Sequence, residues 1–327
     1  MKSLYYDKNG IQLIDHTPKP APGKDEALIR VRMAGICRTD LEITRGYSGF
    51  EGILGHEFVG ELENSIDSFA AGTRVVGEIN AGCGHCEYCR KDLERHCLHR
   101  TVLGIVNRSG CMAEWFTLPA RNLYPVPDSV SDEQAVFTEP LAAALEIFEQ
   151  ILIRPADKVC ILGDGKLGLI IAMLAAHRHE GETLLIGRHG DKLAIVKDRT
   201  AVMLEEDIPG SYNKSWDVVI DATGKSAGLS RAMNLVRPRG VIVLKSTMAE
   251  SEPLDLTPIV VDEINLIGSR CGRFAPALDL LSRGVLPIGR LIDSIHPMEK
   301  ALEAWERALR PGARKVLIRF TGNRPVE

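Results

Sequence analysis

The spacing of apolar and polar positions changes near residue 128. Before it, short apolar runs are bounded by Gly, Pro or Asn, and no helical period separates them. The runs at 27–33, 58–62 and 74–77 are typical of strands. This pattern predicts a mostly antiparallel β domain whose loops carry the chemistry.

After residue 128, helical and strand periods alternate. A helix is expected to start at 131–134, and a longer one runs through 139–150. The strands and helices expected beyond it are 158–162, 183–187, 201–204, 217–222, 226–236, 240–244, 264–268, 276–283, 298–310 and 315–320. Alternation of this kind predicts an α/β fold with a doubly wound parallel sheet.

Length and charge narrow the class of protein. A chain of 327 residues exceeds what one hydrophobic core usually serves, so two domains are expected. The net charge is −4 and no basic run attracts nucleic acid or a membrane, which favours small-molecule partners. The first residues turn polar before a signal peptide could form, so we expect a cytoplasmic protein. In that compartment clustered cysteines indicate metal more than disulfides.

One group of donors has the composition of a catalytic zinc site. Cys37, His56 and Glu57 offer a thiolate, an imidazole and a carboxylate, which can hold zinc and leave one position open. Thr39 is placed to pass a proton outward from an alcohol bound there. Glu139, before a proline and an apolar helix, is a further candidate ligand. The simpler readings are a packed cysteine, a capping histidine and an acid at a helix N-terminus.

A second group is a closed metal site. Cys83, Cys86, Cys89 and Cys97 follow the spacing C-x2-C-x2-C-x7-C, which can wrap one structural zinc from a single loop. Two disulfides are the alternative, and the cytoplasmic setting disfavours them. A zinc-ribbon recognition module in a binding protein is a further alternative, against which the near-neutral charge of the loop weighs.

A dinucleotide motif opens the α/β region. An apolar strand leads into Gly163, Gly165 and Gly168, and then into a helix. The glycines permit the tight turn, the approach of a pyrophosphate and close helix–strand packing, so this G-x-G-x-x-G predicts a cofactor contact that includes Lys166 and Leu167.

The end of the second strand bears on the choice of cofactor. An NAD enzyme is expected to have Asp or Glu there, but the chain has Arg188 and His189. A guanidinium suits a 2'-phosphate, so NADP is preferred over NAD. The alternative is an exposed loop arginine.

Together G-I-C-R-T-D, G-H-E, the four-cysteine loop, T-E-P and G-D-G-K-L-G, in this order, resemble the zinc-dependent medium-chain dehydrogenases of the alcohol, sorbitol and threonine dehydrogenase superfamily. The resemblance covers the whole chain. It implies a GroES-like β catalytic domain at 1–138 and 268–327 and a Rossmann domain at 139–267. It further implies catalytic zinc on Cys37 and His56, with Glu57 or Glu139 as the exchanging ligand. Arg38 and Lys315 resemble cofactor phosphate contacts.

The implied activity is hydride transfer between NAD(P) and an alcohol or polyol, or its aldehyde or ketone. It would use two zinc ions per subunit, one catalytic and one structural. We expect a substrate pocket lined by Thr39, Tyr47, Phe50, Ile79 and Asn80. Relatives are usually homodimers or homotetramers, and a dimer is expected through an edge strand near 241–244. Glu42 stands where many relatives have a histidine, so the sequence does not assign the outer part of the proton path. A zinc-independent double-bond reductase, or a redox-neutral enzyme on the same fold, is the rival enzyme.

Overall fold

The computed structural model describes residues 1–246 and 253–320, which form two compact units. The first comprises residues 1–139, 277–283 and 292 onward; the second comprises residues 140–276 and 284–291. Within the described ranges, no helix has the length and apolar character needed to cross a membrane.

The first unit is built on antiparallel strands. Its strands are β1 (Ser3–Asp7), β2 (Gly10–Ile14), β3 (Glu26–Gly35), β4 (Gly52–Ile53), β5 (Glu57–Leu62), β6 (Arg74–Gly77), β7 (Asn80–Ala81), β8 (Thr101–Val102), β9 (Trp115–Pro119), β10 (Leu123–Pro125), β17 (Ile292–Pro297) and β18 (Lys315–Arg319). The main sheet has the order β10-β6-β5-β3-β18-β17, with β9 also paired to β3. Only the β17–β18 pair in this sheet is parallel among the described pairings. The edge-to-face pair of Phe58 and Phe116 lies in the core of the unit.

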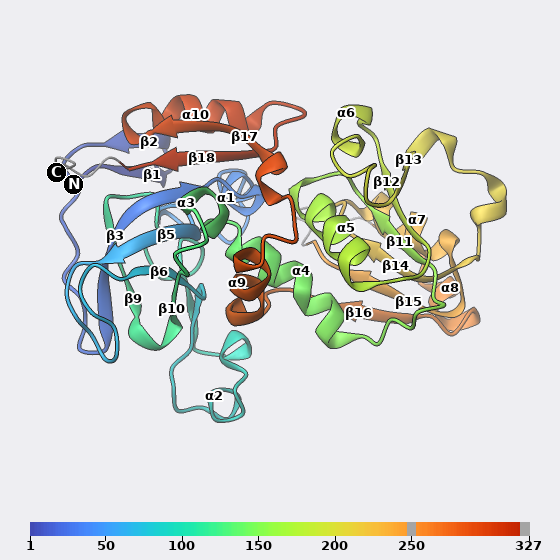
Figure 1. The fold of residues 1–327 in the computed structure, drawn as a ribbon, viewed down its shortest axis with the longest axis horizontal. Coiled ribbons are helices and arrows are strands. Elements are labelled where there is room, and N and C mark those ends of the chain that lie inside the picture. Colours follow the sequence, from blue (N-terminus) through green and yellow to red (C-terminus); the bar gives the residue numbers. More distant parts are fainter. Residues whose placement is uncertain (247–252, 321–327) are drawn as a thin grey trace. The chain divides into compact units, whose positions relative to one another are not determined.

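Short helices connect and cover these strands. They are α1 (Arg38–Ile43), α2 (Glu87–Arg90), α3 (Asp132–Ala135), α9 (Phe274–Ser282, most of it in this unit) and α10 (Ala301–Leu309). Helix α10 packs on β17 and β18, so the last described segment completes the sheet that the N-terminal half began (Figure 1). Strand β17 was not predicted. Its half-exposed residues carry no clean alternation of apolar and polar positions.

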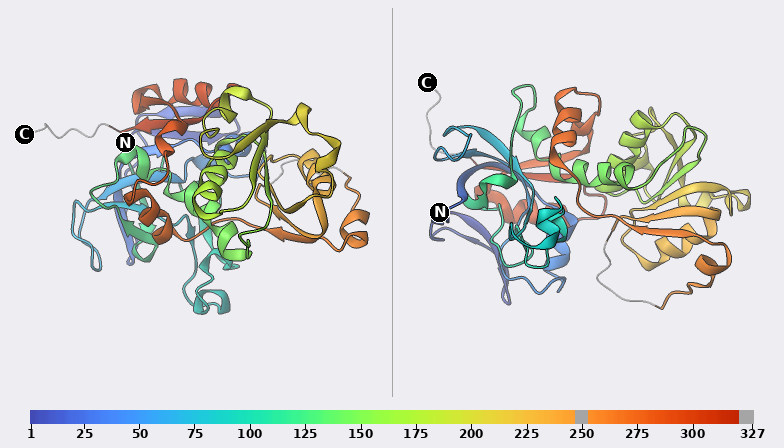
Figure 2. Two further views of the ribbon diagram at one scale, coloured as in Figure 1. Left: turned by 45° about the vertical axis from the view of Figure 1, so that its right-hand side comes forward. Right: turned by 90° about the horizontal axis from the view of Figure 1, so that it is seen from below.

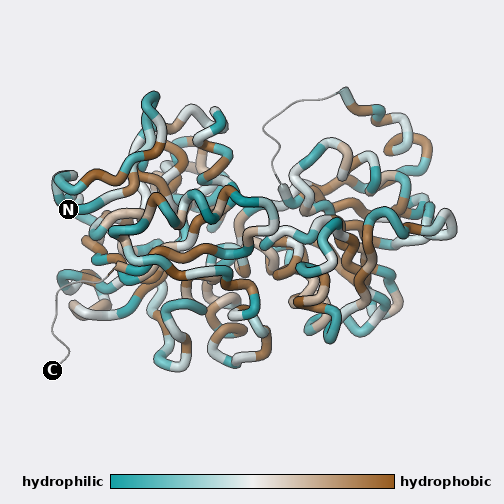
Figure 3. Tube along the Cα trace, turned by 90° about the horizontal axis from the view of Figure 1, so that it is seen from above, coloured by the Kyte–Doolittle hydropathy of each residue, from teal (hydrophilic) through white to brown (hydrophobic). Residues whose placement is uncertain are grey.

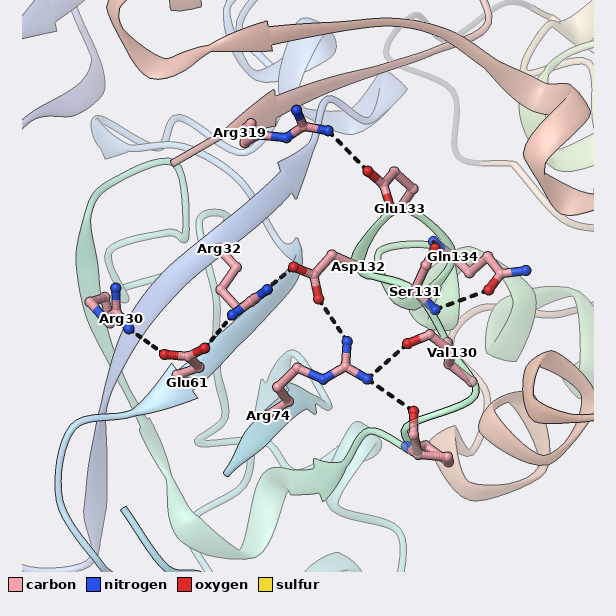
Figure 4. Close-up of polar contacts among 11 residues, drawn as sticks. Arg30, Arg32, Glu61, Arg74, Val130, Ser131, Asp132, Glu133, Gln134 and Arg319 are labelled. Carbon is pink, nitrogen blue, oxygen red and sulfur yellow. Dashed lines mark hydrogen bonds and ion pairs between the residues drawn. The ribbon is translucent and has the colours of Figure 1, made fainter. Parts of the chain in front are cut away.

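Charged side chains anchor α3 to this sheet (Figure 4). The carboxylate of Asp132 accepts hydrogen bonds from Arg32 Nε at 2.6 Å and Arg74 Nη1 at 2.9 Å. Arg74 also donates to the carbonyl oxygens of Pro127 and Val130. Ser131 and Gln134 form a capping box at the helix start that was expected at 131–134. The network fixes the segment that leads to Glu139.

The second unit is a parallel sheet with helices on both faces (Figure 2). Its strands are β11 (Val159–Leu162), β12 (Thr183–Gly187), β13 (Ala201–Leu204), β14 (Trp216–Asp221), β15 (Val236–Leu244) and β16 (Asn265–Gly268). Its helices are α4 (Thr138–Gln150, from Pro140 onward), α5 (Lys166–Arg178), α6 (Gly190–Leu193), α7 (Ser226–Leu235) and α8 (Thr257–Val261). The order β13-β12-β11-β14-β15-β16 reverses direction between β11 and β14, and a ligand crevice lies at the carboxyl ends of strands at such a point.

Both hydrophobic sides of this sheet are covered. Buried residues of β11, β12 and β14, such as Leu162, Ile186 and Val219, form its core together with Trp216 and the inner face of α7. In the hydropathy trace, brown runs alternate with teal turns along this unit (Figure 3). Continuous apolar strands of this kind are typical of a sheet buried on both faces.

Two boundaries differ from expectation. The chain returns to the first unit at Ala277 and not at residue 268, and residues 284–291 belong to the second unit. The segment after β16 stays with α4: a Cβ on Gly272 would lie 1.7 Å from the carbonyl oxygen of Ala142. Residues 241–244 lie in β15, an interior strand between β14 and β16, so the expectation of an edge strand there is wrong. The edge strands of this sheet are β13 and β16.

Candidate metal centres and cofactor site

Strand pairing brings the first donor group together. In the β3–β5 pair Gly35 lies opposite Glu57, and in the β3–β18 pair Gly35 lies opposite Leu317. Cys37 follows the end of β3, and His56 and Glu57 stand at the start of β5, so one corner of the sheet holds all three. Their ligand atoms lie within 4.8 Å of one another. A side chain on Gly35 would not fit, because its Cβ would lie 2.5 Å from Glu57 Oε2.

Asp40 supports this group, and the sequence analysis gave it no role. It is fully buried, and its carboxylate accepts from Cys37 N–H at 2.7 Å and Gly55 N–H at 3.2 Å. Its Oδ1 also lies 3.2 Å from His56 Nδ1, which is an ion-pair contact and not an aligned hydrogen bond. Burial acts to lower the pKa of His56, but Asp40 and Cys37 raise it well above its usual value. Its position three residues after Cys37 is the sequence feature that could have revealed this role, because an acid at that position closes a capping box on α1.

Glu57 has one occupied and one open oxygen. Its Oε2 accepts from the ammonium of Lys315, which is 1% exposed. Its Oε1 is buried and has no hydrogen-bond partner among the described residues. A buried acceptor left unpaired is costly unless a cation or a donor satisfies it, so this corner fits a metal ion.

Lys315 is buried inside the first unit. Its ammonium contacts Glu57 and lies 5.6 Å from the centre of the Phe137 ring, inside the first unit. Burial acts to lower its pKa, and the carboxylate of Glu57 more than offsets this, so the pKa is raised. In the structure this ammonium is paired with Glu57, and the contact of Lys315 with a cofactor phosphate stays a prediction.

The other expected residues of this unit take several positions. Thr39 Oγ1 lies 3.9 Å from Cys37 Sγ, in the first turn of α1. Arg38 is exposed and pairs with Glu42, which also pairs with Arg45. Glu139 stands in the first turn of α4, outside the set of three donors that lie within 4.8 Å. The remaining expected pocket residues are half-buried in the loop before β4 or buried at the start of β7: Tyr47, Phe50, Ile79 and Asn80.

The four cysteines converge in a separate lobe around α2. The sulfur pairs Cys86–Cys89, Cys86–Cys97 and Cys83–Cys89 are 3.5, 3.7 and 4.0 Å apart. Four sulfurs at the usual Zn–S distance lie about 3.8 Å from one another around a tetrahedral zinc. Backbone N–H groups of His85 and Cys86 lower the pKa of the Cys83 thiol, which favours the thiolate that a metal needs. All eight cysteines are free of disulfides.

The glycine-rich turn lies at the carboxyl end of β11. Gly163 has a φ of +105°, a conformation that L side chains rarely adopt. A Cβ on Gly165 would meet open space within 4 Å, while one on Gly168 would lie 1.9 Å from the carbonyl oxygen of Gly163. Gly165 is the N-cap of α5, so the first N–H groups of this helix, starting at Lys166 and Leu167, face an open cradle of the kind that binds phosphate.

Arg188 and His189 directly follow β12 and are half-exposed. Their backbone N–H groups both donate to Asp164, the second residue of the glycine-rich turn. The sequence analysis did not single out Asp164.

Comparisons with known proteins agree with this architecture. The family model for the alcohol dehydrogenase GroES-like domain matches residues 23–128, and that for zinc-binding dehydrogenase matches residues 168–283. A sorbitol dehydrogenase of Halalkalibacterium halodurans is 28% identical over 94% of this chain and 95% of its own. D-arabinitol dehydrogenase 1 of Uromyces fabae is 26% identical over 98% of this chain and 97% of its own.

A solved structure agrees as well. The structure of a short chain alcohol dehydrogenase from Escherichia coli CFT073, complexed with NADH, superposes with a TM-score of 0.88. It is 27% identical, with 98% of this chain and 99% of that chain covered. The two family models match in chain order, and the structure has the β unit and the Rossmann unit that they describe. This protein therefore belongs to the zinc-dependent medium-chain dehydrogenases.

Proposed function

We propose that this protein is a zinc-dependent, NADP-preferring dehydrogenase that interconverts an alcohol or polyol with its aldehyde or ketone. The observation that carries the proposal is the convergence of Cys37, His56 and Glu57, with one carboxylate oxygen left open, in a dehydrogenase fold. The two relatives named sorbitol and arabinitol dehydrogenase favour a polyol over a simple alcohol.

The chain's own residues have separate tasks in this scheme. Cys37, His56 and Glu57 would hold the catalytic zinc, with Glu139 as a second carboxylate close enough to influence Lys315 electrostatically. Zinc in such a site polarises the substrate oxygen. Thr39 takes the alcohol proton and passes it outward, and Asp40 keeps the imidazole of His56 in place. The first N–H groups of α5 bind a cofactor phosphate, and Arg38, which is exposed on the first unit, keeps the cofactor role that the resemblance implies.

The preference for NADP rests on the end of β12. No Asp or Glu stands there to accept from the ribose hydroxyls, and the guanidinium of Arg188 is available for a 2'-phosphate. The Escherichia coli structure holds NADH, so the likeness in fold does not carry this part of the proposal.

The activity test follows nicotinamide absorbance with NADP and with NAD, in both directions, over a panel of polyols, simple alcohols and their carbonyl forms. We expect turnover that is faster with NADP, is lost after zinc chelation and returns on adding Zn²⁺. Cys37→Ser should abolish turnover while cofactor binding persists. Activity that survives metal removal would instead support a zinc-independent reductase.

We further infer that the protein forms a homodimer or homotetramer through the β16 edge of the second unit. Apolar side chains are exposed there on and around α8 and β16: Leu256, Val260, Val261 and Leu266. An unpaired edge strand beside an exposed apolar patch is typical of an isologous interface. The free thiols of both donor groups favour a reducing compartment such as the cytoplasm.

A further inference from the structure

Asp164 connects two loops at the carboxyl edge of the parallel sheet. It lies in the turn after β11, is 6% exposed, and reaches sideways to the end of β12. Its Oδ2 accepts from Arg188 N–H at 2.7 Å and from His189 N–H at 2.6 Å. The two strands pair in parallel, so a carboxylate from the turn after the first strand reaches the end of the second.

The same carboxylate holds the ring of His189. Nδ1 of the imidazole lies 2.9 Å from Oδ2 and 3.1 Å from Oδ1. With Nδ1 engaged, the other ring nitrogen, Nε2, is left for other partners, and the side chain is 40% exposed. Burial acts to raise the pKa of Asp164, but the hydrogen bonds from His189 and Arg188 lower it below its usual value. Asp164 therefore stays an anion that orients its neighbours.

The packing around Asp164 leaves little freedom. A Cβ on Gly187, the last residue of β12, would lie 2.5 Å from Asp164 Cβ and 2.6 Å from its Oδ2. A glycine is therefore required opposite this carboxylate. Both Asp164 oxygens are engaged by the Arg188–His189 segment, so neither is open to a ribose hydroxyl group.

We propose that Asp164 is a positioning residue for cofactor choice: it holds Nδ1–H of His189, so that the imidazolium form presents its Nε2–H, together with the guanidinium of Arg188, to the 2'-phosphate of NADP. This inference rests on the NADP preference proposed above and adds two residues to it. An anion thus promotes the binding of another anion, because it fixes the ring of His189 and the backbone that carries Arg188.

Another carboxylate lies close to Arg188. Glu205 Oε2 is 4.0 Å from Arg188 Nε, and Glu205 Oε1 is 3.3 Å from Arg231 Nη2. Among the described residues, no hydrogen bond or ion pair joins Glu205 to Asp164 or to His189. It therefore provides a matched control: Glu205→Gln and Asp164→Asn remove the same charge near Arg188, but only the second breaks the hold on His189.

The experiment measures binding of adenosine 2',5'-bisphosphate and of 5'-AMP to the full-length protein by calorimetry. These probes differ only in the 2'-phosphate. For the unaltered protein we expect the bisphosphate to bind roughly tenfold tighter, and Arg188→Ala to remove the difference. Asp164→Asn and His189→Ala should each weaken binding of the bisphosphate by roughly fivefold and leave the affinity for 5'-AMP unchanged. The double variant should lose no more than either single one.

The sign of the effect separates positioning from charge. If charge alone mattered, Asp164→Asn would bind the bisphosphate more tightly, as we expect of Glu205→Gln. Equal or tighter binding by Asp164→Asn, or equal weakening of both probes, would overturn the inference while leaving NADP preference intact. Equal affinity of the unaltered protein for both probes would remove the NADP preference, and the inference with it. His189 is exposed enough for His189→Ala to test the pair even if Asp164→Asn folds poorly.

Discussion

At the scale of single residues, the corner formed by β3, β5 and β18 concentrates buried charge. Glu57 and Lys315 are both 1% exposed and pair with each other, next to Cys37 and His56. A buried pair of this kind contributes little net stability as a pair, but removal of one partner leaves the other charge uncompensated. A metal ion bound at this corner would therefore be coupled to folding.

We predict that Lys315→Met destabilises the metal-free protein by about 3–5 kcal/mol, because it leaves Glu57 charged and unpaired. Urea unfolding of the metal-free protein measures the loss, and Zn²⁺ should reduce it by supplying a cation. The double variant Glu57→Gln/Lys315→Met should recover most of the stability. A loss under about 1 kcal/mol for the single variant would show that the pair is solvated in solution.

A half-buried acid, Glu78, gives a pH-dependent prediction. Burial raises the pKa of Glu78 to about 7, above the ordinary value of 4.5. Between these values the folded state binds the proton and the unfolded state does not, so stability is greatest below pH 4.5 and falls as pH rises toward 7. Ionisation of this group then costs roughly 3 kcal/mol at most.

Glu78→Gln should therefore be more stable than the unaltered protein at pH 8 and gain little at pH 5. Urea midpoints at both pH values measure this difference. The exposed Glu51→Gln is the control and should show no such pH dependence. Equal midpoints for Glu78→Gln and the unaltered protein at pH 8 would mean that Glu78 is hydrated.

At the scale of elements, the lobe around α2 depends on its cysteines. Helix α2 has four residues and α1 has six, too short to be stable alone. Between β7 and β8 the lobe has few buried apolar side chains. Two of them, Cys89 and Cys97, are themselves ligand candidates. Without metal, little else holds the loop.

If the four cysteines hold the proposed structural zinc, Cys89→Ser should lower the zinc content by one ion per chain and make residues 82–100 sensitive to protease. The second unit should stay folded and keep its affinity for 5'-AMP, because the lobe belongs to the first unit. Zinc analysis and limited proteolysis test both points. Cys271→Ser, outside the four-cysteine cluster, should keep both ions. Full zinc content in Cys89→Ser would contradict the four-thiolate site.

At the scale of the whole molecule, the apolar patch on α8 and β16 bears on assembly. Val260 is 77% exposed beside the β16 edge strand. Leu152, in the same unit, is 78% exposed but follows α4 and lies outside the patch residues named above. We predict that Val260→Asp lowers the mass in sedimentation experiments to that of a monomer or a smaller assembly, whereas Leu152→Asp does not. An unchanged mass for Val260→Asp would rule out this patch as the interface.

Local pattern determined much of this protein in advance. The strand periods before residue 128 and the alternation after it predicted β3, β5, β6 and the six parallel strands, and the polar residues at 131–134 predicted the start of α3. These signals depend on neighbours in sequence: a strand's faces alternate every two residues, a helix cap satisfies nearby N–H groups, and a glycine permits a tight turn. The four-cysteine spacing is local in the same sense, because one loop supplies all its ligands.

Contacts between distant residues were decided only by the tertiary structure. Lys315 meets Glu57 because β18 pairs with β3, which no local pattern encodes. Asp164 holds His189 because β11 and β12 lie side by side, and β15 is interior because β16 covers it. Whether a charge becomes a ligand, a counter-ion or a positioning group depends on which partner is buried with it, and strand pairing across the chain sets that partner.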